Sequence, residues 1–127
     1  MIVGIVNALL EPTVRLTVRS ASGTDLDIEA VVDTGFSGEL TLPSSVIAAL
    51  GLRWRTRNSR VLADGTKQYV DIYVGIIGWD GMVRHVFVEA ADTHPLVGMA
   101  LIAGNCLQVA AIPGGRVTIE ALPATGP

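Results

Sequence analysis

Val31-Val32-Asp33-Thr34-Gly35 places a carboxylic acid directly after an apolar run that is typical of a buried strand. A carboxylate in that position is costly unless it is hydrogen-bonded or has a chemical role. An isolated Asp-Thr-Gly triplet is more typical of a turn, because Asp caps its own backbone and Gly tolerates positive φ. Asp33 is therefore the first candidate functional residue, and the surrounding sequence has to decide between a turn and a site.

The segments on both sides of this stretch predict β-structure. Thr13–Arg19 and Asp25–Ala30 alternate apolar and polar residues with a period of two, and the turn-like stretch between them predicts a hairpin. After the triplet, Leu40–Leu42 predicts a short strand. Pro43–Gly51 predicts a helix of about two turns, since proline and hydroxyl residues open it and glycine closes it.

The second half of the chain predicts three further hairpins, with a short strand and a short helix before the last one. The ranges are 59–74 around Asp64-Gly65, 72–77 with 83–89, the strand 96–98, the helix 99–103, and 107–112 with 116–120. Many short strands with little helix are typical of a small β-barrel or sandwich. We therefore expect an all-β fold with one or two short helices.

Length and composition favour one domain over residues 1–127. The single Cys106 excludes an internal disulfide framework and a cysteine-rich zinc site. The formal charge of −3 gives no overall positive field, so we expect no nucleic acid and no membrane as partners. Hydrophobic residues make up 50% of the chain. This excess suggests that a partner covers part of the surface.

The apolar stretches do not predict export or membrane insertion. The N-terminus has no basic residue before its apolar run, which argues against a signal peptide. The long uncharged stretch before Arg116 is interrupted by Pro95, Pro113 and Gly114-Gly115, which argues against a spanning helix. We therefore expect a cytoplasmic protein.

Three motifs, in order, resemble those of the retropepsin-like aspartic proteases, in particular the small bacterial members of that clan. Val31–Gly35 resembles the catalytic loop of the family, and Leu62–Thr66 is similar to the hairpin at the flap position. Pro95–Ile102 resembles the apolar-apolar-Gly signature before the C-terminal helix. The resemblance covers nearly the whole chain. It implies a retropepsin-like closed barrel of a single lobe that acts as a homodimer.

The resemblance implies a mechanism that needs two copies of the chain. Because the sequence contains one Asp-Thr-Gly, a two-aspartate site takes Asp33 from each subunit. One carboxylate would activate water and the protonated one would donate to the peptide oxygen, with no cofactor and no metal. We expect a homodimeric aspartic endopeptidase that hydrolyses peptide or protein substrates, fastest at mildly acidic pH. The alternative is a proteolytically inactive dimeric β-domain that binds peptide or protein segments.

The resemblance also assigns supporting roles to residues near Asp33. Thr34 would hydrogen-bond to the loop of the opposite subunit, while Gly35 and Gly98 would allow close packing of the backbone. The residues that would face substrate are Phe36 and the flap residues Ala63, Asp64, Gly65 and Thr66. Core packing is the alternative for Phe36, and a plain tight turn is the alternative for the hairpin.

Two further features concern the loop and the dimer. Ala100 stands where many bacterial relatives have Asp, which removes a local hydrogen bond. By the same resemblance, the terminal strands Val3–Val6 and Val117–Ile119 of two subunits would interleave.

Three other patterns point to different chemistry. Gly35-Phe36-Ser37-Gly38 is similar to the Gly-x-Ser-x-Gly nucleophile elbow of serine hydrolysis, but its last glycine comes one position too early. Cys106 with His85 or His94 could form a thiol site, but Cys106 lies in a long apolar stretch and is expected to be inert core. Residues 53–67 hold five of the nine basic residues, and alternation predicts the arginines of Arg53–Arg57 on one strand face. That face is either a solvated edge or a site for an acidic or phosphorylated partner.

Overall fold

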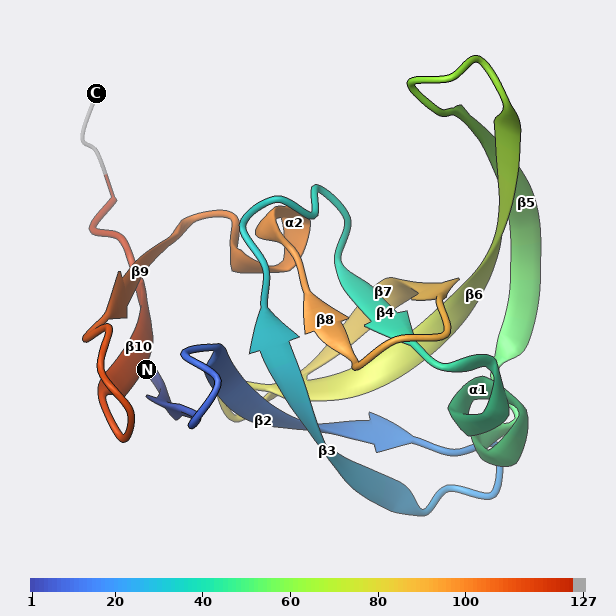
Figure 1. Ribbon diagram of the computed structural model, residues 1–127. Coiled ribbons are helices and arrows are strands. Elements are labelled where there is room, and N and C mark those ends of the chain that lie inside the picture. Colours follow the sequence, from blue (N-terminus) through green and yellow to red (C-terminus); the bar gives the residue numbers. More distant parts are fainter. Residues whose placement is uncertain (125–127) are drawn as a thin grey trace.

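The computed structural model describes residues 1–124, which form one ten-stranded sheet and two short helices (Figure 1). The strands are β1 (Ile2–Val6), β2 (Pro12–Arg19), β3 (Asp25–Val32), β4 (Leu40–Leu42), β5 (Arg53–Val61), β6 (Lys67–Trp79), β7 (Met82–Ala90), β8 (Leu96–Val97), β9 (Asn105–Val109) and β10 (Arg116–Ala121). The helices are α1 (Ser44–Leu50) and α2 (Met99–Ile102). Neither helix in this part of the chain has the length and apolarity needed to cross a membrane. The expected all-β class is confirmed.

Six strands are joined in a ring. The sheet runs from β6 through β7, β4, β8 and β3 to β2, and β2 pairs again with β6 at Thr17↔Gly78 and Val18↔Ile77. Within this ring β8 lies between β3 and β4, and β8 runs parallel to β3, with Val32 beside Val97. Because parallel strands end on the same side, the chain leaves β3 and β8 at the same end of the ring. The loop at Asp33 and helix α2 begin there.

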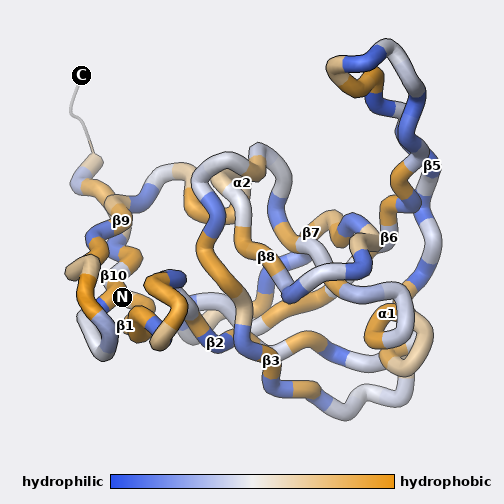
Figure 2. Tube along the Cα trace, viewed as in Figure 1, coloured by the Kyte–Doolittle hydropathy of each residue, from blue (hydrophilic) through white to orange (hydrophobic). Residues whose placement is uncertain are grey.

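The side chains inside the ring form the hydrophobic core. Those with at most 1% exposure include Val18, Leu40, Leu42, Ile77, Val88 and Val97. Figure 2 shows that hydrophobic residues recur along the strands of the ring. Burial of each such side chain stabilises the fold by about 1.5–3 kcal/mol. The buried Thr41 accepts a hydrogen bond from the Leu96 N–H through Oγ1 at 3.0 Å, which fixes β8 against β4.

Most predicted elements are found near their expected positions, but β6 and β5 differ. The expected hairpins 59–74 and 72–77 with 83–89 share one strand, because β6 continues over 13 residues and pairs with β5 first and β7 later. The prediction that the arginines of 53–57 share a face is wrong. A register shift between Trp54 and Thr56 places Arg53 opposite Val74 and Arg57 opposite Asp71, so these two arginines lie on opposite faces.

The terminal strands pair within one chain. β1 pairs with β10, from Ile2↔Ile119 to Ile5↔Arg116, and β9 pairs on the other side of β10. The backbone groups that an exchange between subunits would use are therefore already bonded in the single chain. The expected interleaving of Val3–Val6 with Val117–Ile119 of another subunit stays a prediction, and at this end of the sheet the open edge is β9.

The expectation that Cys106 is inert core is wrong. Cys106 lies on β9, at the edge of the sheet, and it is exposed. Of the next two residues on the strand, Leu107 is half-buried and Gln108 is exposed. An apolar stretch of sequence can form an edge strand as readily as a central one, because apolar composition does not specify how many neighbours a strand has.

We expect Cys106 to react with a thiol reagent in the folded protein. Its exposed side chain needs no unfolding to be reached, so the reaction with 5,5′-dithiobis(2-nitrobenzoate) should proceed without denaturant at a rate within about tenfold of that in 6 M urea. The absorbance of the released thiolate measures both rates. Labelling that requires denaturant would show that Cys106 is covered, and Cys106→Ala provides the blank.

Candidate active site

Asp33 begins a loop that is held against β8. Its N–H donates to the Val97 carbonyl at 2.9 Å, and its carbonyl accepts the Phe36 N–H at 3.1 Å. The carboxylate accepts the Gly35 N–H through Oδ1 at 2.9 Å. Asp33 is half-buried and Gly35 is exposed. The Asp-Thr-Gly stretch is thus a turn, as the triplet alone predicts, and it fixes one carboxylate oxygen at the end of the ring.

Gly98 and helix α2 support this loop from β8. The Met99 N–H donates to the Phe36 carbonyl at 2.8 Å, and the Ala100 N–H donates to the Gly38 carbonyl at 3.1 Å. A Cβ on Gly98 would lie 2.2 Å from the Gly38 carbonyl oxygen and 2.5 Å from the Phe36 ring. Gly98 has an ordinary φ of −102°, so glycine is required here for space and not for conformation.

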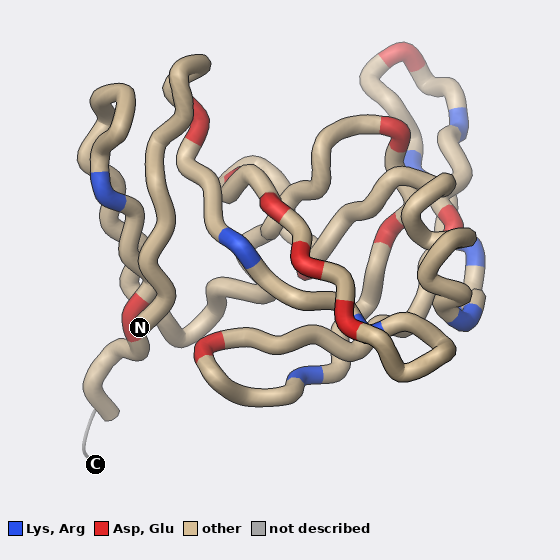
Figure 3. Tube along the Cα trace, turned by 90° about the horizontal axis from the view of Figure 1, so that it is seen from below, with Lys and Arg blue, Asp and Glu red and all other residues tan. Residues whose placement is uncertain are grey.

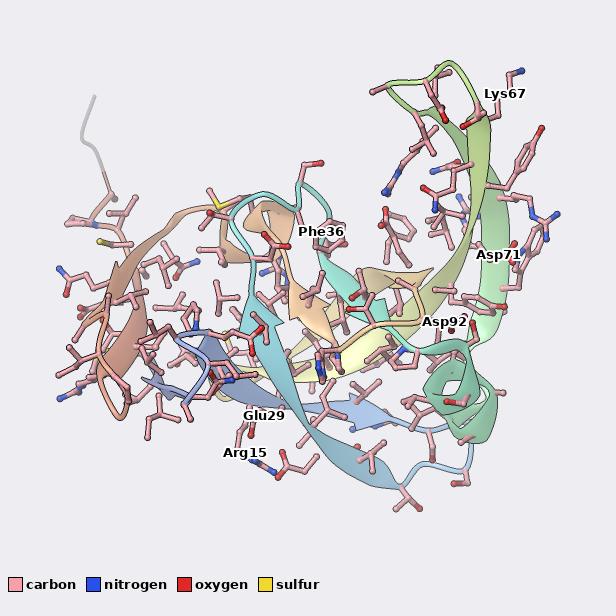
Figure 4. The ribbon with its side chains drawn as sticks, viewed as in Figure 1. Arg15, Glu29, Phe36, Lys67, Asp71 and Asp92 are labelled. Carbon is pink, nitrogen blue, oxygen red and sulfur yellow. The ribbon has the colours of Figure 1, made fainter. Side chains whose placement is uncertain are left out.

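Phe36 packs within the loop. Its ring lies against the two glycines, since a Cβ on Gly38 would also come within 2.5 Å of it. The side chain is half-buried, and it does not line the cavity described below. Phe36 therefore packs between Gly38 and Gly98. This position agrees with core packing, the alternative to substrate contact. In Figure 4 the Phe36 side chain lies at the loop between β3 and β4.

Thr34 and Gly35 form the exposed tip of the loop. Among residues 1–124 the Thr34 hydroxyl has no hydrogen-bond partner, and a Cβ on Gly35 would approach only the Asp33 Oδ1 atom, at 3.2 Å. Contacts within one chain therefore do not explain why position 34 is Thr and position 35 is Gly. Both face outward beside the Asp33 carboxylate.

Glu39 and Arg84 hold the end of the loop, and no sequence motif predicted a role for either residue. The Glu39 carboxylate accepts the Phe87 N–H at 2.9 Å and lies 3.5 Å from the Arg84 guanidinium. Arg84 also donates to the Leu101 carbonyl at 3.1 Å. These contacts join β7, the loop and α2. They hold the segment that contains Ala100, the position at which many bacterial members of the resembled family have Asp.

The β5–β6 hairpin projects from the ring as an arm, formed by residues 53–74. Figure 1 shows it rising on the side of the ring away from β9, with its tip bending toward the loop between β3 and β4. The turn at its tip contains Ala63, Asp64 and Gly65, with Gly65 at φ +84° and the Gly65 N–H donating to the Leu62 carbonyl at 2.9 Å. Thr66 donates to Asp64 through its hydroxyl at 2.6 Å and its N–H at 3.0 Å, which lowers the pKa of the Asp64 carboxyl. The tip is exposed.

A cavity of about 300 Å³ lies between the loop, the arm and β7. Its walls come from four parts of the chain: the loop, β5 with β6, β7 and α2. The lining residues are Gly38, Glu39, Asn58, Ile72, Phe87, Glu89 and Ala100. The structure thus brings the arm and the loop to one hollow, but neither Asp33 nor the tip residues 63–66 line it. Asn58, Phe87 and Glu89 were not predicted from the sequence.

An ion pair spans the inner side of the arm. The Arg60 guanidinium, on β5, donates to the Glu89 carboxylate, on β7, at 2.5 Å. β6 lies between these two strands, so the contact requires the sheet to curl. Glu89 is mostly buried and Arg60 is half-exposed. The pair therefore links the arm to the ring next to the cavity.

Among residues 1–124, no three His, Cys, Asp or Glu side chains are grouped as metal ligands would be. The chemistry available at the loop is that of one partly exposed carboxylate, backbone amides and a free hydroxyl. A lone carboxylate can accept a proton or activate a water, but it cannot also supply a proton in the same state.

Comparisons with known proteins do not assign a family: no protein-family model matches the sequence, and a search of the curated proteins finds no match. The functional argument therefore rests on the geometry of the loop, the arm and the cavity between them, together with the motifs of the sequence.

Proposed function

We propose that the chain is one half of a homodimeric aspartic peptidase of the retropepsin-like kind, with the ring of strands as its closed barrel. One observation supports this most strongly. A short Asp-Thr-Gly turn, held by Val97 and packed on Gly98, presents the Asp33 carboxylate at the end of the ring toward which the tip of the arm bends. A carboxylate held by backbone hydrogen bonds beside a projecting hairpin suits the hydrolysis of an extended peptide.

The site is completed by a second copy of the chain. A two-fold axis beside the loop tip brings Asp33 to its own copy and lets each Thr34 hydroxyl find its partner in the opposite loop. Two carboxylates at hydrogen-bond distance share one proton. This arrangement gives the outward-facing Thr34 and Gly35 a role that the single chain does not supply.

In this mechanism the two carboxylates divide the work. The ionised one removes a proton from a water held between them, and that water attacks the peptide carbonyl carbon. The protonated one donates to the carbonyl oxygen. The tetrahedral intermediate then collapses as the first carboxylate passes the proton from water to the leaving amine and the second regains its proton from a hydroxyl of the intermediate. The step uses only water, the peptide and the shared proton.

The two edges of the sheet differ in a way that favours pairing through β9. β5 has arginines at positions 53, 55, 57 and 60, which discourage edge-to-edge association, whereas β9 has no charged residue. The β9–β10 ladder leaves the N–H and C=O groups of Leu107 and Val109 pointing outward. Since α2 supports the Asp33 loop and leads directly into β9, pairing of two β9 edges lies close to the site.

The cavity beside the loop suits one side chain of the substrate. Ile72, Phe87 and Ala100 give it an apolar wall. The carboxylates of Glu39 and Glu89 are already paired with Arg84 and Arg60. Their charges are thus compensated, and the space next to Ile72 and Phe87 favours an apolar residue of the peptide.

We expect Arg60→Met to loosen the arm without unfolding the protein. The variant loses the ion pair between Arg60 and Glu89. Because the Arg60 side chain is half-exposed, the free energy of unfolding should fall by about 1 kcal/mol or less. Amide hydrogen exchange over residues 56–70, followed by mass spectrometry, should become at least about threefold faster.

Arg15→Met is the matched control, because Arg15 also pairs with carboxylates, Asp27 and Glu29, but within one hairpin. Arm exchange that is equally fast in both variants, or unchanged in Arg60→Met, would show that the Arg60–Glu89 pair does not hold the arm.

Digestion of a broad peptide library between pH 3 and 8 tests the proposed function. We expect cleavage within extended, apolar segments, fastest at mildly acidic pH, and lost in Asp33→Asn. Binding of peptides without any cleavage at any pH would instead support the inactive dimeric β-domain that binds peptide or protein segments.

A further inference from the structure

The outer side of the arm carries an exposed surface that the proposed active site does not use. Cross-strand pairs share a face, so Trp54↔Tyr73, Arg57↔Asp71, Ser59↔Tyr69 and Val61↔Lys67 lie on one side of the hairpin. The opposite side holds Arg60 and the cavity residues Asn58 and Ile72, so it is the inner side. Figure 4 shows Lys67 and Asp71 pointing away from the ring. We call the side chains of Trp54, Arg57, Val61, Lys67 and Tyr69 the outer arm surface.

The outer arm surface combines aromatic and cationic groups. Trp54 is 55% exposed and Tyr69 is 62% exposed, although the chain has only six aromatic residues. The Asp71 carboxylate accepts from the Arg57 guanidinium at 3.0 Å and from the Trp54 Nε1–H at 3.1 Å, and these bonds lower the pKa of the Asp71 carboxyl. They also hold the indole and the guanidinium side by side. Trp, Tyr and Arg are the residues enriched at binding hot spots.

Charge is unevenly divided between the arm and the rest of the chain. Residues 53–74 contain five basic and two acidic side chains, whereas the remaining residues contain four basic and ten acidic ones. Figure 3 shows acidic residues spread over the ring, with most of the basic ones on the side of the arm. In the described residues Arg55 and Lys67 form no ion pair. An edge that only needed protection from aggregation would not also expose Trp54 and Val61.

The edge of β5 is open along the same segment. The Leu62 N–H donates to the Thr66 carbonyl, so the ladder alternation leaves the N–H and C=O groups of Arg57, Ser59 and Val61 pointing away from β6. An extended polypeptide can pair with these groups as an additional strand. Its acidic side chains would then lie beside the cationic ones of the outer arm surface.

We propose that β5 and the outer arm surface bind an extended, acidic segment of a partner protein. The segment pairs with the β5 edge, places carboxylates near Arg57 and Lys67, and packs an apolar residue on Trp54. A polypeptide fits better than a nucleic acid, because the surface is only two strands wide and the acidic ring would repel a long polyanion. This inference does not depend on the proposed peptidase activity.

Fluorescence anisotropy with a labelled peptide of about twelve residues, alternating Glu and Thr with Leu in place of one central Glu, tests the proposal in about 50 mM NaCl. We expect the peptide to bind the wild-type protein and Asp33→Asn equally. We expect Trp54→Ala and Lys67→Glu each to raise Kd at least about tenfold. Arg15→Gln, on the outer face of β2, should leave Kd unchanged.

Three results would overturn the proposal. One is absence of binding by the wild-type protein. Another is equal affinity of the wild-type protein for a peptide with Gln in place of Glu, since charge would then play no part in binding. Equal affinity of Trp54→Ala and wild type for the acidic peptide would likewise show that the indole plays no part. The last is tighter binding of single-stranded oligo-dT of matched length, which would assign the surface to nucleic acid.

Discussion

Asp33→Asn should abolish peptide cleavage while leaving the fold intact. The amide cannot take a proton from water, so we expect the rate of hydrolysis to fall at least about a thousandfold. The side-chain oxygen of Asn can still accept the Gly35 N–H that Asp33 Oδ1 accepts at 2.9 Å. Since Asp33 is partly exposed, the melting temperature should change by no more than about 3 °C. Cleavage of a fluorogenic peptide and circular dichroism measure the two effects.

A second carboxylate in the sequence provides the control for this variant. Asp27 is exposed on β3, six residues before Asp33, and pairs with Arg15 at 3.1 Å. Because Asp27 has no place in the proposed site, Asp27→Asn should retain most of the activity. Cleavage that survives in Asp33→Asn, after contaminating proteases are excluded, would remove Asp33 from the mechanism.

Gly98→Ala should destabilise the protein by about 3 kcal/mol, or about 10 °C in Tm. The new methyl group would lie 2.2 Å from the Gly38 carbonyl oxygen, a backbone atom that cannot move away as a flexible side chain can. It would also meet the Phe36 ring at 2.5 Å. Relief of both contacts requires the Asp33 loop to separate from α2. Thermal unfolding followed by circular dichroism measures the loss.

Gly35→Ala is the matched control in the same loop. Its methyl group would meet only the Asp33 Oδ1 atom at 3.2 Å, so we expect stability to change by less than about 1 kcal/mol. If Gly98→Ala melts within about 2 °C of wild type, the loop does not pack on β8 as described here.

The local parts of the fold were predictable from the sequence. Alternation with a period of two is a property of neighbouring residues, so it located β2, β3 and β4 within a few residues. Pro43 and Gly51 marked the ends of α1, and Gly51 has the positive φ of a helix C-terminus, +66°. The Asp64-Gly65 turn was recognised for the same reason: it depends on a dipeptide and not on distant contacts.

What could not be predicted depends on pairings between distant strands. The second partner of β2, the length of β6 and the edge position of Cys106 follow from the order of strands in the sheet. Alternation also failed at Arg55, where a register shift between its neighbours moves Arg57 to the face opposite Arg53. The cavity was missed because Phe87 and Glu89 reach the loop only through the curl of the sheet.

A crystal structure of the assembly formed at the pH of greatest activity tests the central claim most directly. The distance between the Asp33 carboxylate oxygens of two chains is the decisive quantity. We predict a two-fold pair of loops in which these oxygens approach within about 3 Å and share a proton. Asp33 carboxylates that face solvent and lie far apart in every assembly of the chain would contradict a shared aspartic site.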